Sequence, residues 1–278
     1  MEKLIKRFLK DLLEAQGTAI NTVDAYRNDL RQFNEFSKTY PRKVEKQRLI
    51  LDFISNLKEK GYANSTIDRR IAALASFFNY LIARGKIRVN PCDGIVRTRD
   101  FKFQPQVLTQ KEIALFLATL QKSSTQEVKR DLAMMELLCT TGIRTTELVS
   151  LDIDMFKLDR GTPYIKIKKN GRQRDIAIAP RVVQTLKRYV VQIRPCFVKN
   201  TKEKALFVNR KGERLTRQGV WLKVKEHAKA AGLKDRVTPS VLRHSFAVHQ
   251  LGQGVSLNRV QQLLGHSRVS TTKKHQSV

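Results

Sequence analysis

The chain has 278 residues, 41% of them apolar, and it carries 54 Lys and Arg against 25 Asp and Glu. An ordinary apolar fraction excludes disorder as the main state, and this length suits two domains better than a single core. The formal charge of +29 opposes compaction and predicts a polyanionic partner, either nucleic acid or an anionic membrane surface. No apolar run approaches the roughly 20 residues that span a bilayer, so we expect nucleic acid and no membrane.

The first 95 residues have the pattern of a helical domain. Segment 1–15 is amphipathic and carries acidic residues that a transit peptide avoids, so it is expected to be the first helix. A second helix is predicted from Thr22, with a stripe of apolar residues at helical spacing: Val23, Tyr26, Leu30, Phe33 and Phe36.

A further helix is expected to start at Ser65 as N-cap, with Asp68 three residues later, and to stop at Gly85 before Asn90-Pro91. Its apolar stripe comprises Ile67, Ile71, Leu74, Phe78 and Leu81. We interpret both stripes as core packing.

Periodicity is lost after Asp93, and residues 96–108 form a short polar stretch with Arg97, Arg99 and Lys102. A basic tether between two lobes can follow a phosphate backbone. These residues are therefore the predicted linker.

Residues 109–278 mix helices with a small sheet. Thr109 to Glu112 resembles a capping box, Asp131 to Cys139 a buried helix, and 164–178 a β-hairpin around a Lys-Lys-Asn-Gly turn. Helical patterns recur at 180–194, at 216–231 and from Ser240 onward, and Ala205 to Val208 is predicted as a short strand. Gly252, Gly254 and Gly265 punctuate the last part. The fold class is thus mainly α with a small β-sheet.

The three cysteines, Cys92, Cys139 and Cys196, are isolated. Their odd number and spacing indicate neither a disulfide framework nor a zinc site, so each is interpreted as a small buried hydrophobe. We expect a reducing compartment, the cytoplasm.

Polar residues of chemical interest lie in three segments, 141–148, 238–246 and 263–267. Singly, each has a plain explanation: an arginine at a helix start is usually an ion-pair residue, and a histidine after glycine is often a cap. Their order on a strongly basic chain is more specific. It resembles the tyrosine recombinase and phage integrase family, particularly its bacterial Xer-like members, over nearly the whole length.

The resemblance implies three parts. They are a helical, SAM-like core-binding domain at 1–95, the linker at 96–108, and an α/β catalytic domain at 109–278 that ends early. In the family the two domains form a C-shaped clamp on double-stranded DNA and act as dimers or tetramers, so a homo- or hetero-oligomer on DNA is expected.

The resemblance also assigns a phosphate site. Arg144 and Arg243 match the family's two arginines, whose guanidinium forks hold the non-bridging oxygens of the scissile phosphate. Lys169 matches the lysine that protonates the leaving 5′ oxygen, with the adjacent Lys168 as the alternative, and a solvated hairpin tip as the plainer interpretation. His266 matches a donor to the same phosphate.

Glu147 matches an acidic position interpreted as support for the arginines. No metal and no cofactor are expected, because arginines take the place of the divalent cation that many nucleases use.

Two departures from the family pattern stand out. Ser240 replaces the histidine of the His-x-x-Arg motif, and it can hydrogen-bond a phosphate but cannot carry a proton near pH 7. Nine residues after His266, where the family has its nucleophilic tyrosine, stands His275, and the last tyrosine in the chain is Tyr189. His275 as nucleophile would form a phosphoramidate.

Three functions remain open. The first is site-specific recombination through covalent phosphoprotein links, possible with His275 or with a tyrosine supplied by a partner. The second is a catalytically inactive DNA-binding regulator or synapsis partner. The third, which the ordered motifs disfavour, is an unrelated helical nucleic-acid binder. Candidate DNA contacts, each also interpretable as a solvated charge, are Arg27, Arg31, Arg69, Arg70, Lys168 and Arg172.

Overall fold

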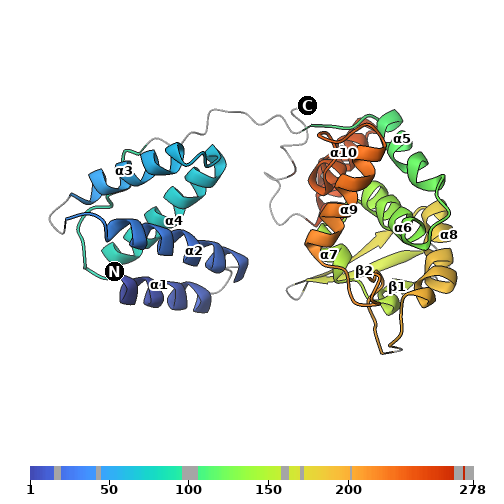
Figure 1. The fold of residues 1–278 in the computed structure, drawn as a ribbon, viewed down its shortest axis with the longest axis horizontal. Coiled ribbons are helices and arrows are strands. Elements are labelled where there is room, and N and C mark those ends of the chain that lie inside the picture. Colours follow the sequence, from blue (N-terminus) through green and yellow to red (C-terminus); the bar gives the residue numbers. More distant parts are fainter. Residues whose placement is uncertain are drawn as a thin grey trace. The chain divides into compact units, whose positions relative to one another are not determined.

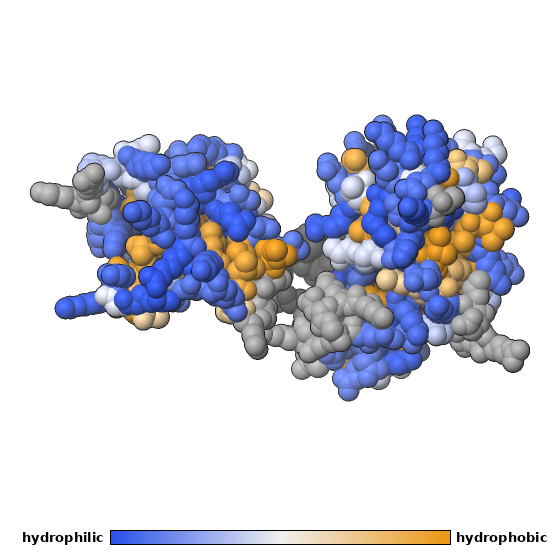
Figure 2. All heavy atoms as spheres, turned by 90° about the horizontal axis from the view of Figure 1, so that it is seen from below, coloured by the Kyte–Doolittle hydropathy of each residue, from blue (hydrophilic) through white to orange (hydrophobic). Residues whose placement is uncertain are grey.

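The computed structural model describes residues 1–15, 20–41, 45–95, 106–157, 163–169, 172–200, 202–265 and 272, with the backbone alone at 168, 169 and 172. The chain divides into two compact units, Met1–Phe103 and Gln104–Val278 (Figure 1). Hydrophilic side chains cover most of the face of each unit seen in Figure 2, with smaller apolar areas among them. In the described part of the chain, no helix is long and apolar enough to cross a membrane.

The first unit is helical. Its helices are α1 (Glu2–Glu14), α2 (Ile20–Ser37), α3 (Lys46–Glu59) and α4 (Asn64–Ala83). Aromatic rings join them: Phe33 of α2 meets Phe53 of α3 edge-on at 5.3 Å between ring centres, and Phe8 of α1 meets Phe77 of α4 at 5.6 Å. Such pairs add to the stabilisation from apolar burial. The sequence pattern predicts α1, α2 and α4, but we identified no signal for α3.

The predicted stripe of α4 is confirmed, since all five of its apolar residues are buried. The predicted N-cap is wrong. The helix begins at Asn64 with Ala63 as N-cap and no side-chain cap, and the Ala63 carbonyl accepts hydrogen bonds from the N–H groups of Thr66 and Ile67. Packing of the stripe therefore sets the start of α4, without help from a cap at Ser65.

The second unit surrounds a three-stranded antiparallel sheet with helices. Its α-helices are α5 (Gln110–Gln121), α6 (Gln126–Thr141), α7 (Thr145–Val149), α8 (Pro180–Arg188), α9 (Arg217–Ala230), α10 (Pro239–Gly252) and α11 (Leu257–Leu264). Its strands are β1 (Phe156–Lys157), β2 (Tyr164–Lys169) and β3 (Arg172–Ala177), and its shorter turns are η1 (Ile153–Met155), η2 (Tyr189–Ile193) and η3 (Arg194–Cys196). The molecule is thus mainly helical with a small sheet, as the sequence predicts.

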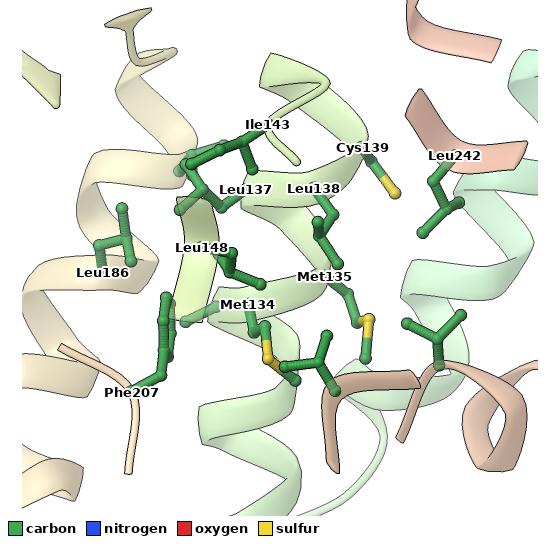
Figure 3. Packing of buried hydrophobic residues seen from close by; sticks show 14 of the residues in the cluster. Met134, Met135, Leu137, Leu138, Cys139, Ile143, Leu148, Leu186, Phe207 and Leu242 are labelled. Atoms are coloured by element: carbon green, nitrogen blue, oxygen red, sulfur yellow. The ribbon is translucent and has the colours of Figure 1, made fainter. Parts of the chain in front are cut away.

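Helix α6 forms the centre of this unit. Met134, Met135, Leu137 and Leu138 are almost completely buried, and they meet side chains of α8, α10 and the 205–208 segment in one cluster (Figure 3). Burial on nearly all sides explains why the sequence around Asp131 to Cys139 shows no clear polar face. The predicted buried helix is confirmed.

The predicted capping box is also confirmed: the Thr109 hydroxyl accepts from the Glu112 N–H, and the Glu112 carboxylate accepts from the Thr109 N–H. The core of this unit begins one residue earlier, at the fully buried Leu108, whose N–H donates to Ser245 Oγ at 2.8 Å. Residues 96–105 of the predicted linker lie outside the described residues.

Two sequence predictions fail in this unit. Ala205 to Val208 is buried but forms only isolated bridges, from Ala205 to Asp152 and from Val208 to Arg214, so it is not a strand. Burial alone produced the apolar run, without a partner strand to pair along its length. Cys92 and Cys139 are buried as predicted, but Cys196 is exposed at the end of η3.

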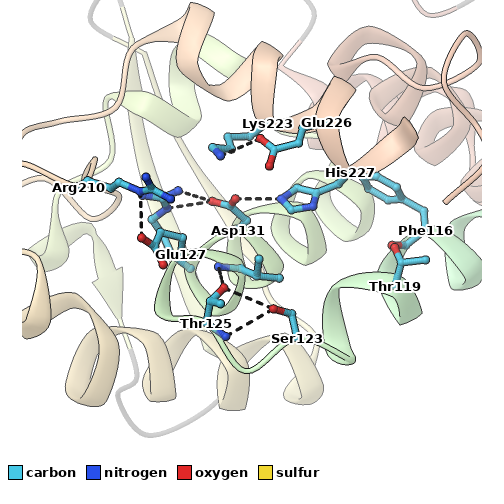
Figure 4. A network of polar contacts seen from close by, with 12 residues as sticks. Phe116, Thr119, Ser123, Thr125, Glu127, Asp131, Arg210, Lys223, Glu226 and His227 are labelled. Atoms are coloured by element: carbon cyan, nitrogen blue, oxygen red, sulfur yellow. Dashed lines mark hydrogen bonds and ion pairs between the residues drawn. The ribbon is translucent and has the colours of Figure 1, made fainter. Parts of the chain in front are cut away.

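A polar network is buried beside α6. Asp131 accepts from Nε and Nη2 of Arg130 at 2.9 and 2.7 Å, and its other oxygen lies 2.9 Å from His227 Nε2 of α9 (Figure 4). Arg130 Nη1 donates to the Val208 carbonyl at 3.1 Å. One carboxylate thus links α6 to α9, and its arginine partner links α6 to the 205–208 segment.

Replacing Asp131 by Ala is expected to reduce the free energy of unfolding by about 3–5 kcal/mol, because it leaves the Arg130 cation buried without its counter-charge. Urea unfolding followed by circular dichroism measures the change. Asp235→Ala, at an exposed position, is the control and should change the free energy by less than about 0.5 kcal/mol. Equal effects of the two substitutions would contradict the importance of the network.

Candidate functional site

Two arginines that are 99 positions apart, Arg144 and Arg243, meet at the end of α11. Arg144 is the N-cap of α7, directly after Gly142 and Ile143, and Arg243 lies in α10. Arg144 Nη1 donates to the Leu264 carbonyl at 3.0 Å, and Arg243 Nη2 donates to the same oxygen at 2.7 Å. The two guanidinium groups therefore lie side by side, within hydrogen-bonding distance of one acceptor.

Further backbone carbonyls hold both groups. Arg144 Nη2 donates to the Gly265 carbonyl at 2.9 Å, and Arg243 Nη1 donates to the Gly142 carbonyl. The last carbonyls of a helix have no partner within the helix and carry partial negative charge, so a helix C-terminus attracts cations. Here the end of α11 orients both arginines.

Glu147 of α7 fixes Arg144 from the other side. Its carboxylate is 3% exposed and accepts from the Arg144 N–H at 2.8 Å and from Arg144 Nη1 at 3.1 Å. It also accepts from both terminal nitrogens of Arg174 in β3, at 2.9 and 3.0 Å. Burial alone would raise the pKa of Glu147, but the hydrogen bonds from Arg174 and Arg144 and their charges hold it below its ordinary value.

The cluster keeps positive charge in excess, with three arginines around one carboxylate. Burial and the charge of Arg144 lower the pKa of Arg243 to about 9, so this guanidinium remains protonated at pH 7. Paired guanidinium groups held in a partly buried site suit a phosphodiester, whose two non-bridging oxygens accept from planar forks.

The remaining catalytic candidates are placed unequally. Ser240 is exposed in the first turn of α10, three residues before Arg243. Lys169 and Arg172 pair with each other in the register of β2 and β3, and Lys168 pairs with Gln173. His266 and His275 lie outside the described residues.

A cleft of about 530 Å³ is lined by Ser240 and by Thr145, which follows Arg144. Arg217, Gln218 and Trp221 of α9 line it as well, and Trp221, the chain's single tryptophan, is 45% exposed. The sequence offered a signal that we did not use, since Thr216 is followed by Arg and Gln as in a capped helix start facing an anion.

Three of the four candidate arginines of the first unit are accessible. Arg27 pairs with Asp24, Arg31 lies 4.0 Å from Glu35, and both arginines line a groove of about 630 Å³ between α1 and α2. Arg69 is half-exposed and pairs with Asp29.

Arg70 is buried, unlike the other three arginines. Its side chain is only 5% exposed, with Nε 3.7 Å from Asp29 Oδ1 and the guanidinium carbon 4.0 Å from the centre of the Tyr62 ring. Arg70 thus joins α4 to α2 through Asp29. Its sequence neighbour Arg69 lies on another face of the helix because successive residues are about 100° apart.

Comparison with known proteins identifies the family to which this fold and arginine cluster belong. The Phage integrase family profile matches residues 106–277, and that of the Phage integrase, N-terminal SAM-like domain matches residues 5–85. The chain is 39% identical to tyrosine recombinase XerC of Roseiflexus castenholzii (strain DSM 13941 / HLO8), over 98% of this chain and 88% of that protein. It is 36% identical to tyrosine recombinase XerD of Listeria monocytogenes serotype 4b (strain F2365), over 98% and 93%.

A solved structure shares the fold. The XerH site-specific recombinase bound to a palindromic difH substrate, in a post-cleavage complex, superposes with a TM-score of 0.78 at 24% identity, covering 98% of this chain and 81% of that one. The chain belongs to the phage integrase family, and the two relatives named above are both tyrosine recombinases.

Gly265 is a sensitive position in the site. It ends α11 with φ +62°, and an added Cβ would clash with Arg174 Nη1. Gly265→Ala is expected to displace Arg174 and to destabilise the protein by about 1–2 kcal/mol for the left-handed backbone plus about 1–3 kcal/mol for the clash.

Gly254→Ala is the matched control, because Gly254 has φ +83° with no atom within 4 Å of an added Cβ. It should show the backbone cost alone. Both variants are compared by urea unfolding, and equal losses would show that Arg174 does not pack tightly against position 265.

The pKa of Glu147 predicts an acid-dependent loss of stability. A carboxylate whose pKa is lowered by folding contributes stability above its unfolded pKa, near 4.5, and loses it as the pH falls through the folded value. The free energy of unfolding of Glu147→Gln should therefore lie below that of wild type at pH 7, and the gap should narrow below about pH 4.5. Urea titrations from pH 3.5 to 7 measure it, and a constant gap would exclude this ionic contribution.

Proposed function

We propose that this chain binds double-stranded DNA and holds one scissile phosphate between Arg144 and Arg243, for strand cleavage and rejoining in site-specific recombination. The observation that carries the proposal is the convergence of both guanidinium groups on the Leu264 carbonyl oxygen. Two forks that reach one oxygen are close enough to grip the two non-bridging oxygens of one phosphate, where negative charge builds up during attack on phosphorus. They supply the positive charge that a divalent cation supplies in other nucleases, so the proposed chemistry needs no metal or cofactor.

Lys169 is the proposed proton donor to the leaving 5′ oxygen. Positions 165, 167 and 169 share one face of β2, because strand residues alternate between faces. Ile165 and Ile167 of that face are buried in the core of the second unit, and Arg174, opposite Ile167, reaches Glu147. This register favours Lys169 over Lys168, whose position belongs to the other face.

His266 and Ser240 complete the proposed site. His266 directly follows Gly265 in the sequence, and the Gly265 carbonyl accepts a hydrogen bond from Arg144. Ser240 precedes Arg243 by one helical turn and is exposed toward the cleft. Both are proposed as hydrogen-bond donors to the phosphate.

DNA binding is proposed to extend beyond the phosphate site. The excess of 29 positive charges supplies non-specific attraction to DNA. In the second unit the proposed contacts are Arg217, Gln218 and Trp221 of the cleft, with Lys168 and Arg172 on the hairpin; in the first unit they are Arg27, Arg31 and Arg69. XerH is described on a palindromic substrate, and because a palindrome offers two equal half-sites, we propose that this chain also binds DNA as a dimer or tetramer.

The nucleophile separates two versions of this function. Tyr189, the last tyrosine of the chain, is 0% exposed and burial raises its pKa to about 12, so it cannot attack DNA. His275 occupies the position nine residues after His266. In one version His275 attacks phosphorus, or a partner supplies a tyrosine. In the second, favoured by the missing tyrosine, the chain is an inactive DNA-binding regulator or synapsis partner of a functional recombinase.

A suicide substrate distinguishes the versions. A binding site is first selected from random duplexes with the full chain, and a nick is placed next to each candidate phosphate in turn, so that cleavage traps a covalent adduct. An adduct with wild type that His275→Ala abolishes identifies His275 as the nucleophile. An adduct with His275→Tyr alone identifies a binder whose phosphate site is competent.

Arg144→Gln and Arg243→Gln in the reactive chain should each lower the adduct rate by at least about 100-fold, which corresponds to one lost transition-state donor. No adduct from any of these chains would overturn the proposed phosphate site. The DNA affinity should fall steeply between 50 and 200 mM salt, and a flat response would overturn DNA binding itself.

A further inference from the structure

We propose that Arg174 is a positioning residue that locks the β2–β3 hairpin to the Arg144–Arg243 pair, so that the lysine and the arginines act on the same phosphate. The inference rests on the proposed function and assigns a role to a residue that the motifs do not include. It follows from the position of Arg174 in the sheet and from the hydrogen bonds that its guanidinium group donates to Glu147.

Arg174 lies beside three isoleucines in one row of the hairpin. It pairs with Ile167 across the strands, and its neighbour in the same row, Ile176, pairs with Ile165; all three isoleucines are buried. Placing a guanidinium in such a row costs desolvation unless a carboxylate satisfies it. Since Glu147 is that carboxylate, the arginine is held in a single direction, toward α7.

The contact between Arg174 and Glu147 is bidentate. Both terminal nitrogens donate to separate carboxylate oxygens at 2.9 and 3.0 Å, and the Arg174 side chain is 19% exposed. The same two oxygens accept from the backbone and side chain of Arg144. Arg144 is therefore positioned by a carboxylate whose own orientation Arg174 determines.

Arg174 also contacts the end of α11. Its terminal nitrogen and guanidinium carbon lie so close to Gly265 that no Cβ would fit between them. The carbonyls of Leu264 and Gly265 at this helix end hold Arg144, and Leu264 also holds Arg243. One side chain from the hairpin thus touches two of the elements that fix the arginine pair.

The attachment of Arg174 also restricts the turn end of the hairpin. Lys169 and Arg172 form the next pair in the same row, two residues beyond Ile167 and Arg174. A rigid attachment at Arg174 fixes the backbone of the hairpin at position 169. Because misplacement by about 1 Å can cost about 100-fold in rate, loss of this attachment should reduce cleavage far more than DNA binding.

The first experiment compares variants in the chain that forms the adduct, whether wild type or His275→Tyr. Arg174→Gln is expected to lower the rate of adduct formation by about 100-fold, while the DNA dissociation constant and its salt slope stay unchanged because both terminal nitrogens of Arg174 bind Glu147. Arg174→Lys should recover part of the rate, since an ammonium keeps the charge but not the fork. Glu147→Gln should resemble Arg174→Gln, and the double variant should be no slower than the slower single variant.

Arg214→Gln is the matched control. Arg214 is a partly exposed arginine of the same unit that pairs with Asp152 and donates to the carbonyls of Val149 and Leu151. Its loss should lower the melting temperature about as much as the loss of Arg174 and leave the adduct rate unchanged. If Arg214→Gln slows cleavage equally, or Arg174→Gln weakens binding in proportion to the rate, Arg174 is not a positioning residue.

A second readout needs neither DNA nor cleavage. Arg144 has a side chain that is 30% exposed, so its reaction with phenylglyoxal can be followed by mass spectrometry. Hydrogen bonds to Glu147 should slow this reaction, and Arg174→Gln should accelerate it several-fold while Arg214→Gln does not. Without any adduct the proposed function fails, but this reaction still decides the role of Arg174: an unchanged rate at Arg144 overturns it.

Discussion

The site depends on one geometric constraint: two arginines from different helices share the carbonyl at the end of α11. Like charges repel, so guanidinium groups do not gather unless negative groups hold them. Here the end of a helix and one buried carboxylate, Glu147, hold them in place before DNA arrives. A catalyst benefits from donors arranged in advance, because the cost of ordering them has been met during folding.

The core of the second unit makes this arrangement possible. Helix α6 is buried on nearly all sides and ends at Gly142, whose left-handed backbone turns the chain into Arg144. An added Cβ at Gly142 would lie 2.5 Å from the ring of Phe246 in α10 and 2.9 Å from the side chain of Leu264 in α11. Close packing at this glycine brings α6, α10 and α11 together. As a result, Arg144, just after α6, lies next to Arg243 of α10.

Positive charge serves two purposes at different ranges. Accessible arginines such as Arg27, Arg31 and Arg217 are the proposed contacts to the DNA backbone, which they would attract without regard to sequence. Buried or half-buried arginines act through geometry: Arg130 joins α6 to the 205–208 segment, Arg70 joins α4 to α2, and the Arg144–Arg243 pair forms the proposed phosphate site. The count of basic residues alone cannot separate these classes, because burial decides which of them reach a ligand.

Local sequence determined the helices with clear stripes, the Thr109 capping box and the hairpin, since periodicity, caps and turns depend on neighbouring residues. The two arginines were singled out only by the resemblance of their motifs to a known family. Only the tertiary structure decided that Arg70 is buried, that 205–208 is not a strand, and that Arg174 turns toward Glu147. In each of these cases the outcome depends on contacts between residues distant in the chain, which a local pattern does not encode. The alternation that places Arg174 on the same face as Ile176 was visible in the sequence. Why an arginine stands there became clear only from the structure, in which Glu147 of α7 neutralises its charge.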